Sequence, residues 1–125
     1  MNETQVKTVL IVDDSAMIRR LLRNIVVKNG FKVVGEANTG KKGFEKFKQL
    51  NPDIVTMDMV MDEMTGLESL KHILEFDPKA NVIIVSSMGQ TVIIRDAIVA
   101  GAKDFLIKPF DEKDVMDSIR KLKLS

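Results

Sequence analysis

The chain has 125 residues with 19 basic and 18 acidic side chains, so its formal net charge is +1. That length suits one globular domain, and a near-neutral charge argues against a nucleic-acid-binding surface, which needs an excess of basic side chains on one face. Cysteine is absent and His72 is the single histidine, which excludes disulfides, thiolate or multi-histidine metal sites and cysteine nucleophiles.

Two kinds of apolar segment alternate along the chain. Short runs rich in β-branched residues predict five strands buried on both faces, in chain order residues 9–12, 33–34, 54–57, 82–85 and 105–107. After each run, apolar residues recur at helical spacing and predict a helix. The five sets are Ile18, Leu21, Leu22, Ile25 and Val26; Phe44 and Phe47; Leu67, Leu70 and Leu74; Ile94, Ala97 and Ile98; and Val115, Ile119 and Leu122. Strict alternation of this kind predicts an α/β domain with a doubly wound parallel sheet.

Capping residues stand where this alternation requires helix boundaries. Ser15 suits the N-cap of the first helix and Gly30 suits its end. The other boundaries are marked by Asn51-Pro52, Asp77-Pro78, Gly101 and, at the start of the fifth helix, Asp111. No linker interrupts the pattern, so we expect a single domain over residues 1–125 without an output domain. No apolar run approaches the ~20 residues of a membrane span, and the polar first residues lack the features of a secretory signal, so we expect a cytoplasmic protein.

Carboxylates follow two of the predicted strands directly. Asp13 and Asp14 come after residues 9–12, and Asp58 comes after residues 54–57. In an open parallel sheet, ligands bind beyond the carboxyl ends of the strands. If these two strands are neighbours, three carboxylates meet there and raise one another's pKa, a conflict that a divalent cation such as Mg²⁺ removes. The alternative is that Asp13 and Asp14 only begin a loop or cap the first helix, a common role of Asp.

Two further polar residues stand at the ends of the fourth and fifth predicted strands. Ser86 follows residues 82–85, and Lys108 follows residues 105–107. Taken singly, a turn serine and a solvated lysine are the commoner interpretations. Together with the three carboxylates, they place a metal site, a hydroxyl donor and a cation at one edge of the sheet, a combination that suits a phosphoryl group.

Several separate motifs of the chain resemble those of response-regulator receiver domains. They are residues 9–14, residues 52–58, residues 101–105 and Lys108-Pro109-Phe110. Residues 86–90 are similar to the corresponding segment of stand-alone chemotaxis regulators within that family. The resemblance implies a flavodoxin-like (βα)5 fold with strand order 2-1-3-4-5.

The resemblance also implies a role for each site residue. Asp58 would accept a phosphoryl group from a histidine kinase, as a carboxylate nucleophile. The Mg²⁺ ligands would be Asp13 (through water), Asp14, Asp58 and the backbone carbonyl of Val60. Lys108 and Ser86 would each contact a phosphoryl oxygen. Phe105 stands at the position of an aromatic switch residue. A core residue at a strand start is the simpler interpretation, and both could hold, in two rotamers of the ring.

Phosphorylation would change the charge at Asp58 from about −1 to about −2 and add acceptor oxygens, which favours a second conformation. In the family, the output surface is formed by the fourth helix, fifth strand and fifth helix, here roughly residues 90–122. We expect a monomer that binds a partner protein there, with the flagellar motor switch as one candidate, and that is not itself an enzyme.

One position departs from the family pattern and several functions remain open. Asp62 replaces the usual proline after Met61, either as a solvated loop residue or as a group that modestly raises Mg²⁺ affinity.

Within the family, a phosphorelay regulator of another pathway and the isolated receiver of a DNA-binding regulator are alternatives. An aspartyl-phosphate phosphatase would need a second Asp where Val60 stands. An FMN carrier would need aromatic residues, and the chain has no Trp or Tyr.

Overall fold

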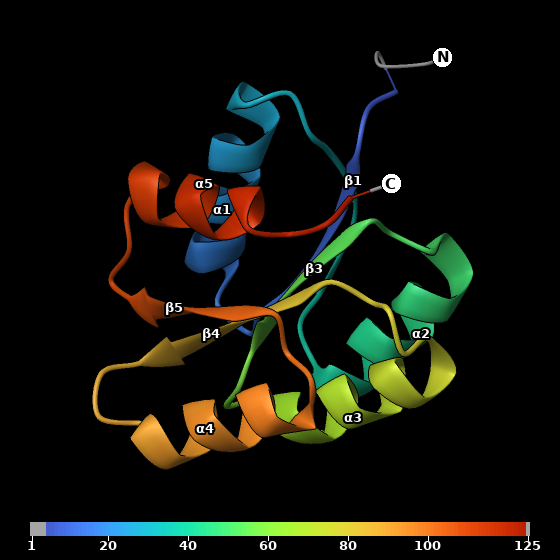
Figure 1. Ribbon diagram of the computed structural model, residues 1–125, viewed down its shortest axis with the longest axis vertical. Coiled ribbons are helices and arrows are strands. Elements are labelled where there is room, and N and C mark those ends of the chain that lie inside the picture. The colour runs from blue at the N-terminus through green and yellow to red at the C-terminus, as the bar shows by residue number, and fades with distance from the viewer. Residues whose placement is uncertain (1–4, 125) are drawn as a thin grey trace.

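The computed structural model describes residues 5–124, and strands alternate with helices along all of them (Figure 1). The strands are β1 (Thr8–Val12), β2 (Lys32–Ala37), β3 (Ile54–Asp58), β4 (Val82–Ser87) and β5 (Asp104–Lys108). The helices are α1 (Ala16–Lys28), α2 (Gly40–Leu50), α3 (Gly66–Phe76), α4 (Thr91–Ala100) and α5 (Glu112–Arg120). The predicted number, order and type of elements are confirmed.

The five strands form one parallel sheet with the order β2-β1-β3-β4-β5. Helices α1 and α5 cover one face of this sheet, and α2, α3 and α4 cover the other (Figure 1). The flavodoxin-like fold class is therefore confirmed. Because β1 and β3 are neighbours and the chain reverses direction of winding between them, the crevice expected for a ligand lies at their carboxyl ends.

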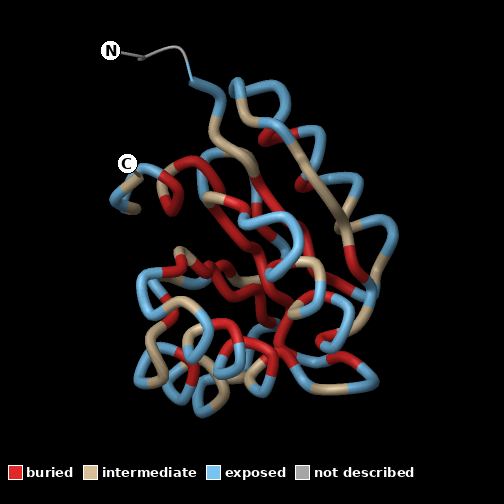
Figure 2. The backbone as a smooth tube through the Cα atoms, turned by 90° about the vertical axis from the view of Figure 1, so that its right-hand side faces the viewer, coloured by how far each residue is buried: buried red, intermediate tan, exposed pale blue. Residues whose placement is uncertain are grey.

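Two apolar cores lie on the two faces of the sheet, and alternate residues of each central strand contribute to one or the other. Leu10 and Val55 belong to the core under α2, α3 and α4, whereas Val9 and Ile54 belong to the core under α1 and α5. Figure 2 shows this buried centre in red. The prediction of doubly buried strands holds for β1, β3 and β4. It is wrong for the two edge strands: in β2 Val33 and Val34 are only half-buried, and in β5 Phe105 is exposed and Ile107 is only half-buried.

Most helix boundaries fall where the capping residues predict them. The Ser15 side chain accepts a hydrogen bond from the Ile18 N–H at 3.3 Å, and Gly30 has a φ of 94° just beyond α1. Leu122 departs from expectation because α5 ends at Arg120; the residue lies in the following turn, although it still packs against the core under α1 and α5. Within residues 5–124, no helix is both long and apolar enough to cross a membrane.

Candidate functional site

Three carboxylates meet at the carboxyl ends of the two central strands. Asp13 follows β1 directly, and Asp58 is the last residue of β3 rather than the first residue after it. The parallel pairing of Val12 with Met57 places these ends side by side. One carboxylate oxygen from each of Asp13, Asp14 and Asp58 lies within 4.8 Å of the others. The sequence prediction that these residues converge is therefore confirmed.

Asp13 has a different environment at each of its two carboxylate oxygens. Its side chain is buried, and Oδ1 accepts a hydrogen bond from the Ser15 N–H at 2.9 Å. Oδ2 has no hydrogen-bond partner among the described residues; it forms an ion pair with Lys108 Nζ at 3.3 Å. The loop-forming interpretation of Asp13 is thus correct for one oxygen. The other is a buried oxygen that faces the site and can accept a ligand.

Asp58 is buried to a similar extent, with 5% of its surface exposed. Burial and the neighbouring negative charge of Asp13 raise the pKa of Asp58 to about 6, against the opposing effect of Lys108. Burial is also the main cause of the raised pKa of Asp13. Asp14 is exposed. Two carboxylates thus lie in a poorly solvated position, where bound cations or protons stabilise them.

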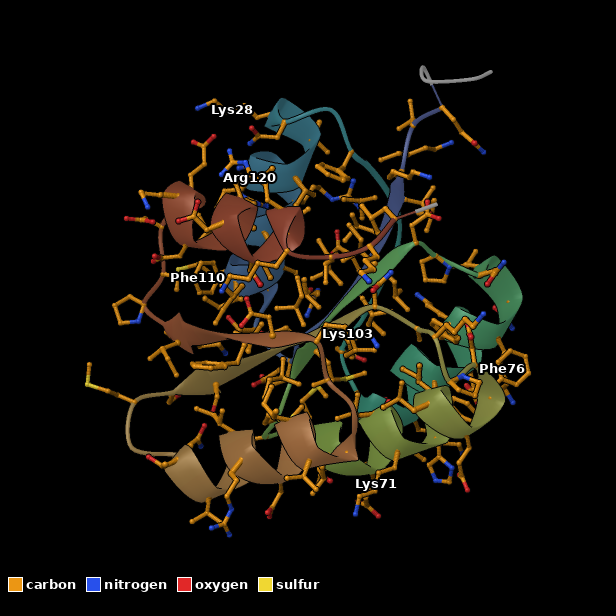
Figure 3. The ribbon with its side chains drawn as sticks, in the orientation of Figure 1. Lys28, Lys71, Phe76, Lys103, Phe110 and Arg120 are labelled. Atoms are coloured by element: carbon orange, nitrogen blue, oxygen red, sulfur yellow. The ribbon has the colours of Figure 1, made fainter. Side chains whose placement is uncertain are left out.

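Within residues 5–124, one lysine reaches the cluster. Lys108 is the last residue of β5, and its Nζ lies 3.3 Å from Asp13 Oδ2 and 3.7 Å from Asp58 Oδ1. The Lys108–Pro109 peptide bond that follows is cis, and Phe110 then turns toward the core under α1 and α5, as Figure 3 shows. A single ammonium group leaves the three carboxylates with a surplus negative charge. That surplus and the orphaned Asp13 oxygen fit a hard divalent cation held by oxygen ligands.

The remaining predicted site residues are near the cluster but do not all face it. Ser86 lies in β4 one position beyond Val85, the residue that pairs with Asp58. Its hydroxyl donates a hydrogen bond to Gln90 Oε1. Val60 is exposed and its N–H makes a long contact, 3.5 Å, with Asp58 Oδ1. Phe105 is 42% exposed, so it is not a core residue in this conformation.

Asp62 lies outside the carboxylate cluster that the described residues form. It is exposed. A cavity of about 800 Å³ lies at the opposite, amino-terminal edge of the sheet, lined by residues such as Asn51 and Lys103. It contains none of the predicted site residues. The predicted site residues therefore lie at the edge of the sheet opposite to this cavity.

Three residues that support the site were missed by the sequence argument. The Arg19 guanidinium donates to the Asp13 carbonyl at 2.7 Å. A Cβ on Gly66 would lie 2.0 Å from the Asp58 carbonyl oxygen, so only glycine lets α3 begin this close to β3. Gln90 holds Ser86. The Thr65-Gly66 pair at the start of α3 was a sequence signal for Gly66. No local sequence pattern signals Arg19 or Gln90.

Comparisons with known proteins agree with this geometry. The response regulator receiver domain family matches residues 9–120. The chemotaxis protein CheY of Thermotoga maritima is 48% identical over 93% of this chain and 97% of its own length. CheY of Bacillus subtilis is 50% identical over 90% of this chain and 94% of its own length.

A solved structure shows the same fold. A chain in the CheX-CheY-BeF3-Mg complex from Borrelia burgdorferi superposes with a TM-score of 0.89 at 36% identity, covering 95% of this chain and 91% of that one. The match of family, fold and site chemistry extends over nearly all the described residues. This chain belongs to the response regulator receiver domain family.

Proposed function

We propose that Asp58 is the residue at which this response regulator accepts a phosphoryl group, and that a histidine kinase supplies it. The single observation that carries this proposal is the set of three converging carboxylates with one lysine, in which Asp13 Oδ2 is buried without a hydrogen-bond partner among the described residues. Such a site needs positive charge and contains a carboxylate nucleophile. Receiver domains are signalling proteins, so the product of this reaction is a state of the protein itself.

In the reaction, a carboxylate oxygen of Asp58 forms a bond to phosphorus while the bond from phosphorus to the kinase histidine nitrogen breaks. Lys108 Nζ, 3.7 Å from Asp58 Oδ1, is placed to pair with a phosphoryl oxygen. Ser86 supplies a hydroxyl for another oxygen once that hydroxyl is released from Gln90. These side chains hold and orient the group, as electrostatic stabilisation of phosphoryl transfer requires.

Asp13, Asp14 and Asp58 would hold Mg²⁺, with Asp13 acting through water and the Val60 carbonyl as a further ligand. When bound, Mg²⁺ supplies charge neutralisation for the carboxylates and for the incoming phosphoryl oxygens. The buried Asp13 oxygen, which lacks a hydrogen-bond partner among the described residues, and the all-oxygen donor set support this choice of metal. The relative crystallised with BeF3 and Mg also supports it.

We propose that α4, β5 and α5 form the output surface of the protein and that the protein acts in chemotaxis. The relatives named CheY support the pathway, and one relative was crystallised with CheX. On this surface Val92, Val99 and Phe105 are exposed apolar residues, which are suited to a protein partner such as a component of the flagellar motor switch. Phe105 would change its rotamer when Ser86 moves toward the phosphoryl group.

Incubation with Mg²⁺ and acetyl phosphate, followed by intact mass measurement, tests the proposal. We expect one phosphoryl addition to the wild type and none to Asp58→Asn. Asp53→Asn is the matched control, because Asp53 is a carboxylate that is bound instead to the backbone and side chain of Thr8; it should be phosphorylated normally. Phosphorylation of Asp58→Asn, or no phosphorylation of the wild type with either acetyl phosphate or a histidine kinase, would overturn the proposal.

A further inference from the structure

The start of α4 differs from the start of every other helix in the described part of the chain. A side chain caps each of the other four, and these capping residues are Ser15, Thr39, Thr65 and Asp111. The N-cap of α4 is Gln90, whose side chain makes no capping hydrogen bond within residues 5–124. Its amide is directed elsewhere, to the end of β4.

Gln90 Oε1 accepts two hydrogen bonds from that strand. One comes from the Ser86 hydroxyl and the other from the Ser87 N–H at 2.8 Å. Ser86 itself is almost fully buried, with 1% of its surface exposed. A hydroxyl has one proton to donate, so while Ser86 donates to Gln90 it cannot donate to any other acceptor.

We propose that Gln90 is a positioning residue that holds the Ser86 hydroxyl away from the phosphoryl site and thereby sets how readily the site accepts its ligand. The inference rests on the proposed phosphoryl site at Asp58. A phosphoryl oxygen at that site must compete with Gln90 Oε1 for the single Ser86 proton. The cost of breaking the Ser86–Gln90 hydrogen bond is therefore subtracted from the affinity of the site.

The same contact connects the site to α4. When Ser86 turns toward a phosphoryl oxygen, Gln90 loses one of its two partners on β4 while the first turn of α4 still lacks a side-chain cap. Uncapped helix termini open more readily than capped ones. The position of Gln90 thus connects occupancy of the site to the start of α4.

The test compares Gln90→Ala, which removes the acceptor oxygen, with Gln90→Glu, which keeps an oxygen at that position. Met88→Ala is the matched control, because Met88 is an 80% exposed residue of the same loop. The first measurement uses the protein without metal or phosphate analogue: the exchange rate of the Ser87 amide proton by NMR. We expect it to rise about fivefold in Gln90→Ala, the effect of losing one hydrogen bond, and to stay within about twofold of the wild-type rate in Gln90→Glu and Met88→Ala.

The second measurement is the affinity for beryllium fluoride, a phosphoryl analogue, in the presence of Mg²⁺. Gln90→Ala should bind it roughly fivefold more tightly than the wild type, whereas Gln90→Glu and Met88→Ala should bind it no more tightly. In a Ser86→Ala background the effect of Gln90→Ala should disappear, because the competition then has no shared proton. A merely structural role of Gln90 would weaken binding and would persist without the serine.

Failure of this inference and failure of the proposed function give different results. If the wild type binds beryllium fluoride but Gln90→Ala binds it equally or less tightly, Gln90 does not restrain Ser86. If the tightening survives in the Ser86→Ala background, Gln90 acts through another group and the inference is wrong. If the wild type binds no beryllium fluoride at all, the phosphoryl site itself is wrong and the inference falls with it.

Discussion

Two groups of charged residues near the carboxyl end of β1 behave in opposite ways. On β2, Glu36 lies between two arginines, with Arg19 Nε at 2.9 Å and Arg23 Nε at 2.7 Å. Burial works to raise its pKa, but the hydrogen bonds from Arg23 and Arg19 outweigh burial and hold the pKa below its ordinary value. Around Asp13 and Asp58, burial prevails and both pKa values are raised.

The difference lies in the balance of charge. At Glu36, two guanidinium groups more than neutralise one carboxylate. The ion pairs of Arg19 and Arg23 with Glu36 therefore require no ligand to balance their charge. One ammonium group faces three carboxylates at the Asp13, Asp14 and Asp58 cluster. Such an arrangement destabilises the free protein and is expected where a protein binds a ligand. A carboxylate with a shifted pKa therefore indicates a ligand site at the Asp13, Asp14 and Asp58 cluster, where the carboxylates outnumber the cations, but not at Glu36, where the arginines outnumber the carboxylate.

Removing one carboxylate from the cluster should produce the largest change. Asp14→Asn is expected to bind Mg²⁺ 10- to 100-fold more weakly, because an oxygen ligand is lost from a small donor set. Titrating Mg²⁺ and following the melting temperature by circular dichroism measures this effect, since a ligand of the native state stabilises it by mass action. Glu36→Gln is the matched control and should bind Mg²⁺ as the wild type does. Equal Mg²⁺ affinity in Asp14→Asn would exclude Asp14 as a ligand.

Neutralising Asp58 should stabilise the metal-free protein. The folded protein holds a proton on Asp58 up to pH about 6, whereas the unfolded chain releases it near 3.8. Within that window the native state binds more protons, so the Asp58 contribution to stability falls as pH rises from about 4 to 6. Without Mg²⁺ at pH 7, we expect Asp58→Asn to unfold with a free energy up to about 2 kcal/mol higher than the wild type.

Urea unfolding of both proteins at pH 4 and pH 7 checks this expectation. The gap between Asp58→Asn and the wild type should be small at pH 4 and wide at pH 7, and saturating Mg²⁺ should narrow it. A gap that does not depend on pH would show that the charge of Asp58 is not the cause.

Glu36 should show the opposite sign. Its folded pKa is lowered, so its ion pairs contribute stability above the pKa of the unfolded chain, near 4.5, and that contribution is lost as pH falls through the folded value. Glu36→Gln should therefore lower the free energy of unfolding at pH 7 by about 0.2–1 kcal/mol, the range measured for exposed ion pairs. Denaturant titration measures it, and high salt should reduce the loss. A stabilised Glu36→Gln would remove the contrast between the two groups.

The smallest change is expected at Asp62, which replaces a proline of the family pattern. The residue is exposed and outside the cluster of described carboxylates, so the effect of its charge on the cluster is screened by salt. Asp62→Asn should alter Mg²⁺ affinity by less than about twofold in 0.15 M salt, as measured by calorimetric titration. A larger loss of Mg²⁺ affinity would show that Asp62 is part of the metal site.

Much of this molecule follows from its sequence alone. Alternating β-branched runs and amphipathic segments determine the (βα)5 pattern, because a parallel sheet covered on both faces is the arrangement that buries both kinds of segment. Asp13, Asp14, Asp58 and Lys108 meet because residues directly beyond or at the carboxyl ends of parallel strands share one edge. Local pattern was misleading at the sheet edges, where Val33 and Phe105 are less buried than their side chains suggest.

Only the tertiary structure decided which oxygens are paired and which groups hold the site in place. Asp13 uses one oxygen for the loop and leaves the other with an ion pair to Lys108 but no hydrogen bond among the described residues, a division that composition and spacing do not contain. Arg19 reaches the Asp13 carbonyl from α1, and Gln90 reaches back from the start of α4 to Ser86. Hydrogen bonds of this kind depend on where a side chain ends in space after the helices have packed. The sequence therefore determines where the charged groups gather, and the packing of the helices determines their hydrogen-bond partners.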